Sequence, residues 1–262
     1  MAFCRDRLTK ELQSKKYSVV RLPRTGIEPL DIYGVEGKLR TYLGRVQDLW
    51  TADDSKNDIK IDEGNATEIG VTETHSMRLS AAFELLKDTF LAAVWDVPKV
   101  KTAYEGAKRL QIAFEQVTFR RANVLQLGKY LNKADLPLSN AIIQQYFFSG
   151  SAYAIVLTEV LRAGSIRIDA QSSMKGEVSI DVDALEALSN AKLTATANRA
   201  IQGSVTYKGS EPVTFAFKAI RLMLDKGMWT VEGVDPDVDL GSSGTVPVLI
   251  DPLDPDGLTD LV

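Results

Sequence analysis

The sequence predicts an α+β protein, in which a twisted, mostly antiparallel sheet is surrounded by helices and followed by an extended C-terminal tail. Of the 262 residues, 45% are apolar and 25% are charged, a composition typical of a folded chain with a sizeable core. Strand patterns dominate after residue 151. Residues 233–262 contain seven Asp and no Glu, Lys or Arg, so the chain divides into a body, 1–232, and an acidic tail, 233–262.

The chain begins with a pattern that predicts a short amphipathic helix at 3–14. Cys4, Leu8 and Leu12 recur every four positions and therefore fall on one face of this helix. So short a helix is marginal in isolation, and we expect it to pack on the rest of the body.

Two strands and an ambiguous segment follow this helix. The strands are expected at 17–22 and 30–33. Pro23 ends the first of them because proline has no N–H to donate to a sheet. The apolar spacing of 39–50 fits either a strand-turn-strand with Gly44 at the turn or a helix.

The middle of the chain alternates between the two periodicities. Strand patterns are expected within a polar loop at 59–61 and over the longer, alternating stretch 66–79. Ser80 is placed to cap a helix over 81–94. Residues 103–119 fit a helix or a strand, and their β-branched and aromatic content favours the strand. Two further helices are expected at 122–132 and 139–147.

Strand patterns fill most of the remaining body. A hairpin across Ala163-Gly164 is expected to join strands at 153–161 and 165–170. Later elements are expected as strands at 177–182, 192–207, 213–224 and 229–232, with a short helix at 183–189. Lys208-Gly209-Ser210 is expected to turn the long strand 192–207 into the next one.

The sequence offers no recognisable catalytic or metal-binding motif. It has one cysteine, Cys4, and one histidine, His75, so these residue types cannot form a zinc site between them. His75 lies in a predicted strand, and Cys4 lies in the N-terminal segment, which is a poor platform for a positioned nucleophile. The basic residues are scattered and do not form a nucleic-acid-binding motif. We therefore predict no catalytic residues, no metal and no nucleic-acid partner.

The sequence favours a cytoplasmic protein. The N-terminus lacks the apolar core of a signal peptide, and no apolar run reaches the roughly 18 residues of a membrane-spanning helix. A single cysteine rules out an intrachain disulfide, so the fold needs no oxidising compartment.

Several segments resemble the bacterial gasdermins when they are taken in order. The resemblance begins with Tyr17-Ser-Val-Val-Arg-Leu-Pro-Arg-Thr-Gly-Ile-Glu-Pro-Leu-Asp31. It continues through Leu43-Gly-Arg-Val-Gln-Asp-Leu-Trp50, Leu110-Gln-Ile-Ala-Phe-Glu-Gln-Val117 and Leu127-Gly-Lys-Tyr-Leu131. The chain length, the cysteine near the N-terminus and the short acidic tail agree with this family.

The resemblance implies a pore-forming cell-death protein, not an enzyme. In such a protein the body, 1–232, is the pore-forming domain and the tail, 233–262, is an autoinhibitory peptide. A protease encoded nearby, caspase-like or of another kind, would remove the peptide. The cytoplasmic monomer would then bind membrane lipids and assemble into a large homo-oligomeric β-barrel pore in the inner membrane, which kills the cell and limits phage spread. The resemblance also implies palmitate on Cys4 and no other cofactor.

The tail offers candidates for both the cut and the inhibitory contact. Its flexible loop is the expected cleavage region, and its apolar run is the expected anchor on the body. The loop residues are Leu240, Gly241, Ser242, Ser243 and Gly244, and the anchor residues are Val246, Val248, Leu249 and Ile250. A cut after Leu240 leaves 31 basic and 35 − 4 = 31 acidic residues, so activation would uncover a surface without making the body strongly basic.

Two stretches are candidates for membrane hairpins, and rival functions remain open. Residues 66–79 and 192–207 both exceed the roughly 9–11 residues of a tilted transmembrane strand. The same alternation is also typical of ordinary strands in a soluble sheet. The main alternative function is a soluble lipid-binding carrier without pore activity. A hydrolase that uses His75 is a second alternative.

Overall fold

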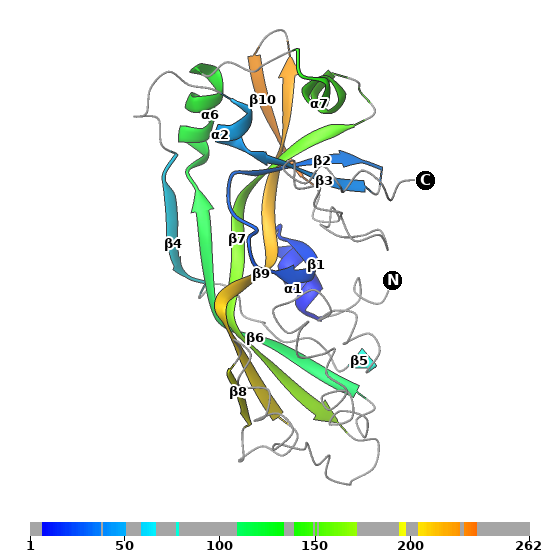
Figure 1. Ribbon diagram of the computed structural model, residues 1–262, viewed down its shortest axis with the longest axis vertical. Helices are drawn as coiled ribbons and strands as arrows, with labels where there is room; N and C mark the ends of the chain where they lie inside the picture. Colours follow the sequence, from blue (N-terminus) through cyan, green and yellow to red (C-terminus); the bar gives the residue numbers. More distant parts are fainter. Residues whose placement is uncertain are drawn as a thin grey trace, which may run out of the picture.

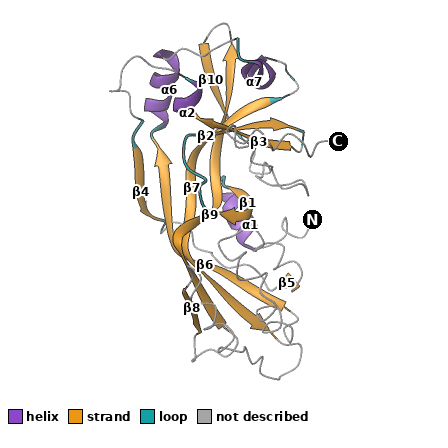
Figure 2. Cartoon of the chain, in the orientation of Figure 1, coloured by secondary structure: helices purple, strands orange, loops and turns teal. Residues whose placement is uncertain are grey.

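The computed structural model is elongated, and a single curved sheet runs along most of its length (Figure 1). The structure describes residues 7–37, 39–50, 59–66, 77–78, 109–133, 139–148, 150, 152–171, 194–197, 204–225 and 228–234. Within these ranges strands outnumber helices, and the helices lie beside the sheet (Figure 2). The predicted α+β class with a mostly antiparallel sheet is confirmed.

Ten strands of the described chain form the sheet. They are β1 Ser18–Arg24, β2 Asp31–Glu36, β3 Leu39–Arg45, β4 Ile61–Asn65, β5 Met77–Arg78, β6 Arg109–Ala122, β7 Tyr153–Gln171, β8 Thr194–Ala197, β9 Ser204–Asp225 and β10 Met228–Gly233. All of the pairings are antiparallel.

The two longest strands, β7 and β9, lie side by side at the centre of the sheet. The outer edge of β9 is covered in turn by β10, β1 and β8. The outer edge of β7 carries β2 near one end and β6 over the rest. Because β6 in turn carries β4 and β5, the sheet widens on both sides of the β7–β9 pair.

The helices pack against the sheet at two places. In α1, Arg7–Ser14, Leu8 and Leu12 are buried, as their spacing predicted. Near one end of the sheet lie α2 Val46–Leu49, α6 Val124–Lys133, α7 Ala141–Ile143 and the π-helix η2 Gln144–Phe148. The helices predicted at 122–132 and 139–147 are therefore confirmed in position, and the second continues as a π-helix.

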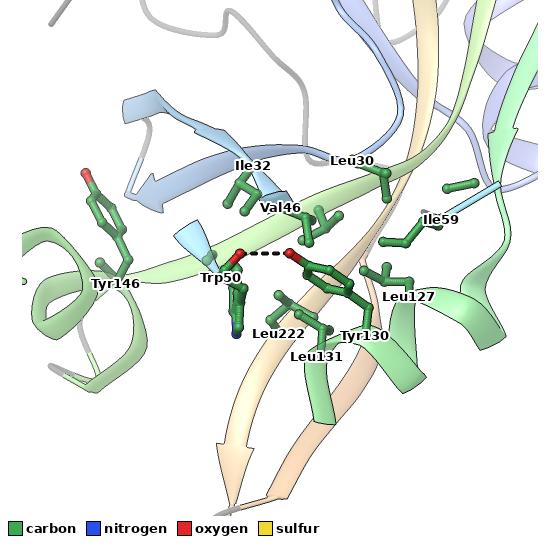
Figure 3. Close-up of a cluster of buried hydrophobic side chains, with 14 residues drawn as sticks. Leu30, Ile32, Val46, Trp50, Ile59, Leu127, Tyr130, Leu131, Tyr146 and Leu222 are labelled. Carbon is green, nitrogen blue, oxygen red and sulfur yellow. Dashed lines mark hydrogen bonds between the residues drawn. The ribbon is translucent and has the colours of Figure 1, made fainter. Parts of the chain in front are cut away.

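The first half of β7, which is uppermost in Figure 1 and is called its upper half below, is buried on both faces. Ala154 and Val156 belong to one apolar cluster, whereas Ile155 and Leu157 belong to another. Successive strand residues point to opposite faces, so these clusters lie on opposite sides of the sheet. Figure 3 shows the first cluster, in which the Tyr130 hydroxyl donates a hydrogen bond of 2.7 Å to the Trp50 carbonyl.

Two predicted turns are wrong because the chain continues through them as strand. The hairpin across Ala163-Gly164 is absent, since β7 runs without a break from Tyr153 to Gln171. Likewise, β9 continues through Lys208-Gly209-Ser210. Glycine tolerates a local irregularity as readily as it does a turn, and here both sites are irregularities within long strands.

Three other expectations need correction. Residues 192–207 are not one strand, because β8 pairs antiparallel with the start of β9. The segment 39–50 is neither alternative but a strand, β3, followed by one helical turn, α2. The turn is started by the Asp48 carboxylate, which accepts the Arg45 N–H at 2.8 Å. Pro23 does not end β1, which reaches Arg24 with a shifted register.

Other predictions agree with the structure or lie beyond it. Residues 103–119 contain the start of β6, which settles the helix-or-strand alternative in favour of the strand. The short strand expected at 59–61 is found slightly later, as β4. The elements predicted at 81–94, 177–182 and 183–189 lie outside the described residues, as does most of 66–79.

Candidate functional site: a bend across three long strands

The three longest strands, β6, β7 and β9, have 14, 19 and 22 residues and share one irregular level. In Figure 1 all three change direction there. On β6, Gln116 has a φ of 54°, a left-handed conformation that is uncommon for a residue with a side chain. Gln116 lies between the pairs Glu115↔Ser165 and Val117↔Ala163, so it faces Gly164 of β7.

The β9 side of this level is interrupted more strongly. The pairing of β7 with β9 moves from Ala163↔Val213 to Ser165↔Lys208. A single residue of β7, Gly164, therefore lies opposite four residues of β9, 209–212, with the sequence Gly-Ser-Glu-Pro. Such an insertion bends a strand and increases its twist. The three irregular segments, Gln116, Gly164 and 209–212, are called the bend below.

The glycine of the bend makes room for the unusual glutamine. A Cβ atom at position 164 would lie 2.7 Å from Oε1 and 3.2 Å from Cβ of Gln116. Since real Cβ atoms avoid such contacts, a larger residue at 164 would have to displace the Gln116 side chain. The bend is therefore built by two strands together.

An aromatic pair crosses the bend. Phe114 lies in the ladder below it, paired with Ile166. Phe215 lies above it, next to Ala216, which pairs with Leu161. The two rings stack with centroids 4.4 Å apart and an interplanar angle of 4°, and both side chains are buried. The stack links β6 to β9 over the intervening β7, so it ties together the two arms of the bent sheet.

Ion pairs lie on both sides of the bend. Above it, Glu28 bridges Arg120 of β6 and Arg162 of β7, with an oxygen 3.4 Å from the Arg162 guanidinium. Below it, the Arg167 guanidinium lies 2.8 Å from a Glu115 oxygen and 3.2 Å from an Asp169 oxygen. These groups are partly exposed, so each pair stabilises the fold only modestly.

The N-terminal segment is attached to the sheet by a buried carboxylate. The Tyr17 hydroxyl donates a hydrogen bond to Glu159 of β7, and both residues are buried. The Lys218 ammonium of β9 lies 3.5 Å from the same carboxylate and 4.2 Å from the centre of the Tyr17 ring. This arrangement compensates the Glu159 charge and holds β1 against the central strands.

A second buried carboxylate, Asp31, begins β2. Burial raises the pKa of its carboxyl to about 7, although the Glu28 N–H and the Arg45 guanidinium oppose that rise. The Arg45 guanidinium lies 3.8 Å away and its side chain is 46% exposed, whereas the Asp31 side chain is only 3% exposed. Water therefore screens the opposing charge more than it solvates the carboxylate, and burial dominates.

Most residues singled out by the sequence lie outside the described chain. They are Cys4, His75, the loop Leu240, Gly241, Ser242, Ser243 and Gly244, and the run Val246, Val248, Leu249 and Ile250. Their predicted roles therefore stay predictions. Within the described ranges, no three His, Cys, Asp or Glu side chains are grouped as a metal site. In the same ranges, no helix combines the length and apolarity needed to cross a membrane.

Sequence reasoning missed the bend itself. The sequence predicts a turn at Ala163-Gly164 and another at Lys208-Gly209-Ser210, and both glycines belong to the bend instead. Nothing in the local sequence marks Gln116, because its conformation is imposed by its partners on β7.

Comparison with known proteins gives a consistent result. The sequence model of the bacterial gasdermin family matches residues 20–232. A gasdermin of Vitiosangium sp. is 28% identical over 265 residues, which covers 100% of this chain and 99% of the relative. A gasdermin of a Desulfuromonadales bacterium is 23% identical, and the alignment covers 92% of this chain and 90% of that relative. The solved structure of a bacterial gasdermin from Bradyrhizobium tropiciagri aligns with a TM-score of 0.66 and 16% identity, covering 87% of this chain and 91% of that one.

Proposed function

The chain belongs to the bacterial gasdermin family, and from that premise we propose that it is an inhibited pore precursor activated by proteolysis. Family membership supports a pore-forming function rather than an enzymatic one. The observation that carries the proposal is the extent of the match, residues 20–232, which is nearly all of the proposed pore-forming domain, 1–232.

The proposed domain boundary is supported from two directions. The family match ends at residue 232, and the last described strand, β10, ends at Gly233. The tail, 233–262, carries seven of the 35 acidic residues and none of the 31 basic ones. We propose that this tail is the autoinhibitory peptide and that a protease cuts it in the loop from Leu240 to Gly244.

The shape of the sheet suits a protein that inserts strands. Spanning strands need roughly 9–11 residues, and β6, β7 and β9 are all longer than that. Below the bend, apolar rows such as Ile112–Ile168–Val205 alternate with polar rows such as Gln111–Asp169–Ser204. A barrel wall in a membrane requires this two-faced alternation. We propose that these strands form part of the oligomeric pore in the inner membrane, whose opening kills the cell as an antiphage response.

Acylation of Cys4 is a separate part of the proposal. The buried residues Leu8 and Leu12 support it indirectly, because Cys4 precedes Leu8 by four positions in the sequence, the spacing at which Leu8 precedes Leu12. A single acyl chain anchors a protein only weakly, so palmitate would assist oligomerisation without replacing it. Intact-mass measurement of the chain purified from its native host, beside Cys4→Ala, tests this directly. An identical mass apart from the substitution would exclude the modification.

The central experiment is dye release from anionic liposomes. The full chain is compared with a chain that ends at Leu240, and we expect release from the shorter chain alone. A full chain in which Val246, Val248, Leu249 and Ile250 are all replaced by Ser tests the anchor, and we expect it to leak without proteolysis. As the matched control, Asp251, Asp254, Asp256 and Asp260 are replaced by Asn, which keeps the apolar run and is expected to stay inhibited. A folded, acylated chain ending at Leu240 that releases no dye would contradict the pore function.

A further inference from the structure

We propose that the bend is a hinge that straightens when the sheet enters a membrane, and that the Gln116 backbone is its switch. The inference rests on the proposed pore function and adds the place where the strands must change shape. It starts from the positions of the three irregular segments. Gln116 on β6, Gly164 on β7 and residues 209–212 on β9 lie at the same level of three neighbouring strands.

The bend is incompatible with a strand ladder in hydrocarbon. Residues 209–212 have no partners in the β7 register, and Gln116 departs from extended geometry. In lipid every backbone N–H and C=O must be paired, because no water is available to satisfy it. The bend must therefore either straighten on insertion or remain outside the bilayer.

The geometry of Gln116 points to straightening. A left-handed conformation disfavours any residue that has a Cβ atom, so the bent form holds Gln116 in an unfavourable state. An extended conformation would relieve it. The bent precursor is thus biased toward a straighter strand.

Contacts across the bend oppose that bias in the precursor. The Phe114–Phe215 stack joins the ladder below the bend to β9 above it. A straight sheet would carry Phe114 away from Phe215, because the two rings lie on opposite sides of the hinge level. The two rings must therefore separate before the sheet can straighten.

The test uses two substitutions at one residue that act in opposite directions. Gln116→Val disfavours the left-handed conformation and favours an extended strand, whereas Gln116→Gly does the reverse. In the chain that ends at Leu240, we expect dye release about tenfold faster for Gln116→Val and about tenfold slower for Gln116→Gly than for the parent. Phe215→Leu, which removes the stack, is expected to accelerate release as well.

Matched controls separate the hinge from general effects on the strand. Gln111 lies on the same strand in regular pairing with Asp169, so Gln111→Val and Gln111→Gly change strand propensity without touching the bend. Neither is expected to alter the rate by more than about twofold. The full chain carrying Gln116→Val must remain folded by circular dichroism and release no dye. If the Gln116 pair and the Gln111 pair behave alike, the switch is refuted.

A distance measurement tests the hinge independently of leakage. Spin labels are attached at Arg109→Cys and Arg121→Cys, two exposed positions of β6 on opposite sides of the bend, in a Cys4→Ser background. In the liposome-bound chain we expect the label separation to rise toward about 40 Å, the length of twelve extended residues. An unchanged separation on membranes would overturn the hinge even if dye is released. A failure of the unlabelled parent to release dye would instead count against the proposed function.

Discussion

The two halves of β7 have opposite relations to the rest of the protein. Above the bend, Ala154, Ile155, Val156 and Leu157 are all buried, with one cluster on each face of the sheet. Below it, Ile166 and Ile168 are buried, whereas Arg167 is partly exposed and paired with acidic neighbours. One strand thus serves both as the centre of a globular core and as part of a two-faced ladder. The second kind of strand already has one solvated face, so it can exchange its surroundings without opening an apolar core.

The largest expected effect on stability comes from a charge placed in the upper half of β7. Val156→Asp introduces an unpaired carboxylate at a fully buried position, and we expect it to lower the free energy of unfolding by about 4 kcal/mol or more. In the lower half, Thr206→Asp places the same charge opposite Arg167 on the polar face and should cost less than about 1 kcal/mol. Urea denaturation of both variants measures the difference. Equal losses would show that the two halves do not differ.

The next largest effect concerns Asp31, which belongs to the upper half. Its pKa is raised to about 7 in the fold, so the folded chain holds a proton that the unfolded chain loses near pH 4. Stability from this residue is therefore full below about pH 4 and declines as the pH rises to about 7. Asp31→Asn removes the titration, so its advantage over the parent should grow by about 3–4 kcal/mol across that range. Parallel urea titrations at pH 4, 5.5 and 7 measure this change, and parallel pH profiles would disprove it.

A third test addresses the helices that cover the upper half. Gly34 of β2 lies under the Tyr146 ring of η2, and a Cβ atom there would be 2.3 Å from the ring. We expect Gly34→Ala to displace the π-helix and to cost about 1–3 kcal/mol. Gly128 of α6 has no heavy atom within 4 Å of such a Cβ, so Gly128→Ala should instead stabilise the protein by up to about 1 kcal/mol. Thermal unfolding of the two variants should shift in opposite directions, and a neutral Gly34→Ala would place η2 elsewhere.

The smallest expected effect lies in the lower ladder. Arg167→Gln removes contacts to Glu115 and Asp169 on a face that is partly exposed. We expect a loss of about 1 kcal/mol or less, smaller still in 1 M salt, where screening is strong. A double-mutant cycle with Glu115→Gln isolates the pair. A coupling of several kcal/mol would mean that the lower ladder is held by its charges and not by its apolar rows.

The sequence predicts the elements better than it predicts their continuity. Apolar spacing was sufficient for α1 and α6, because each helix packs one face on the sheet. It was insufficient for β7 and β9, where Gly164 and Gly209 have the same local composition as a turn. Whether a glycine ends a strand or bends it depends on the neighbouring strands, and those pairings are not encoded locally. The bend could only be seen once Gln116, Gly164 and 209–212 were placed at the same level.

The candidate site divides in the same way. Family resemblance was recognisable from segments such as Tyr17–Asp31, and the match over 20–232 confirms it. The contacts that hold the bend could not be recognised from the sequence. Phe114 and Phe215 lie about a hundred residues apart, and their stacking follows from the sheet order β6–β7–β9. Glu28 and Asp31 are ordinary acidic residues in the sequence. Only burial and their basic neighbours distinguish them.

The pairing of β1 with β9 has a consequence for how the protein is made. Thr214 of β9 also donates a hydrogen bond to the carbonyl of Ile27, which follows β1 and lies 187 residues earlier. In the described sheet β1 has no other strand partner than β9. During synthesis at roughly 5–20 residues per second, the first strand must wait about 10–40 s for its partner to be translated. Contacts so distant in sequence also slow folding after release. The nascent N-terminal segment therefore stays without its sheet partner until most of the chain has been made, and the sheet is completed only at the end of synthesis.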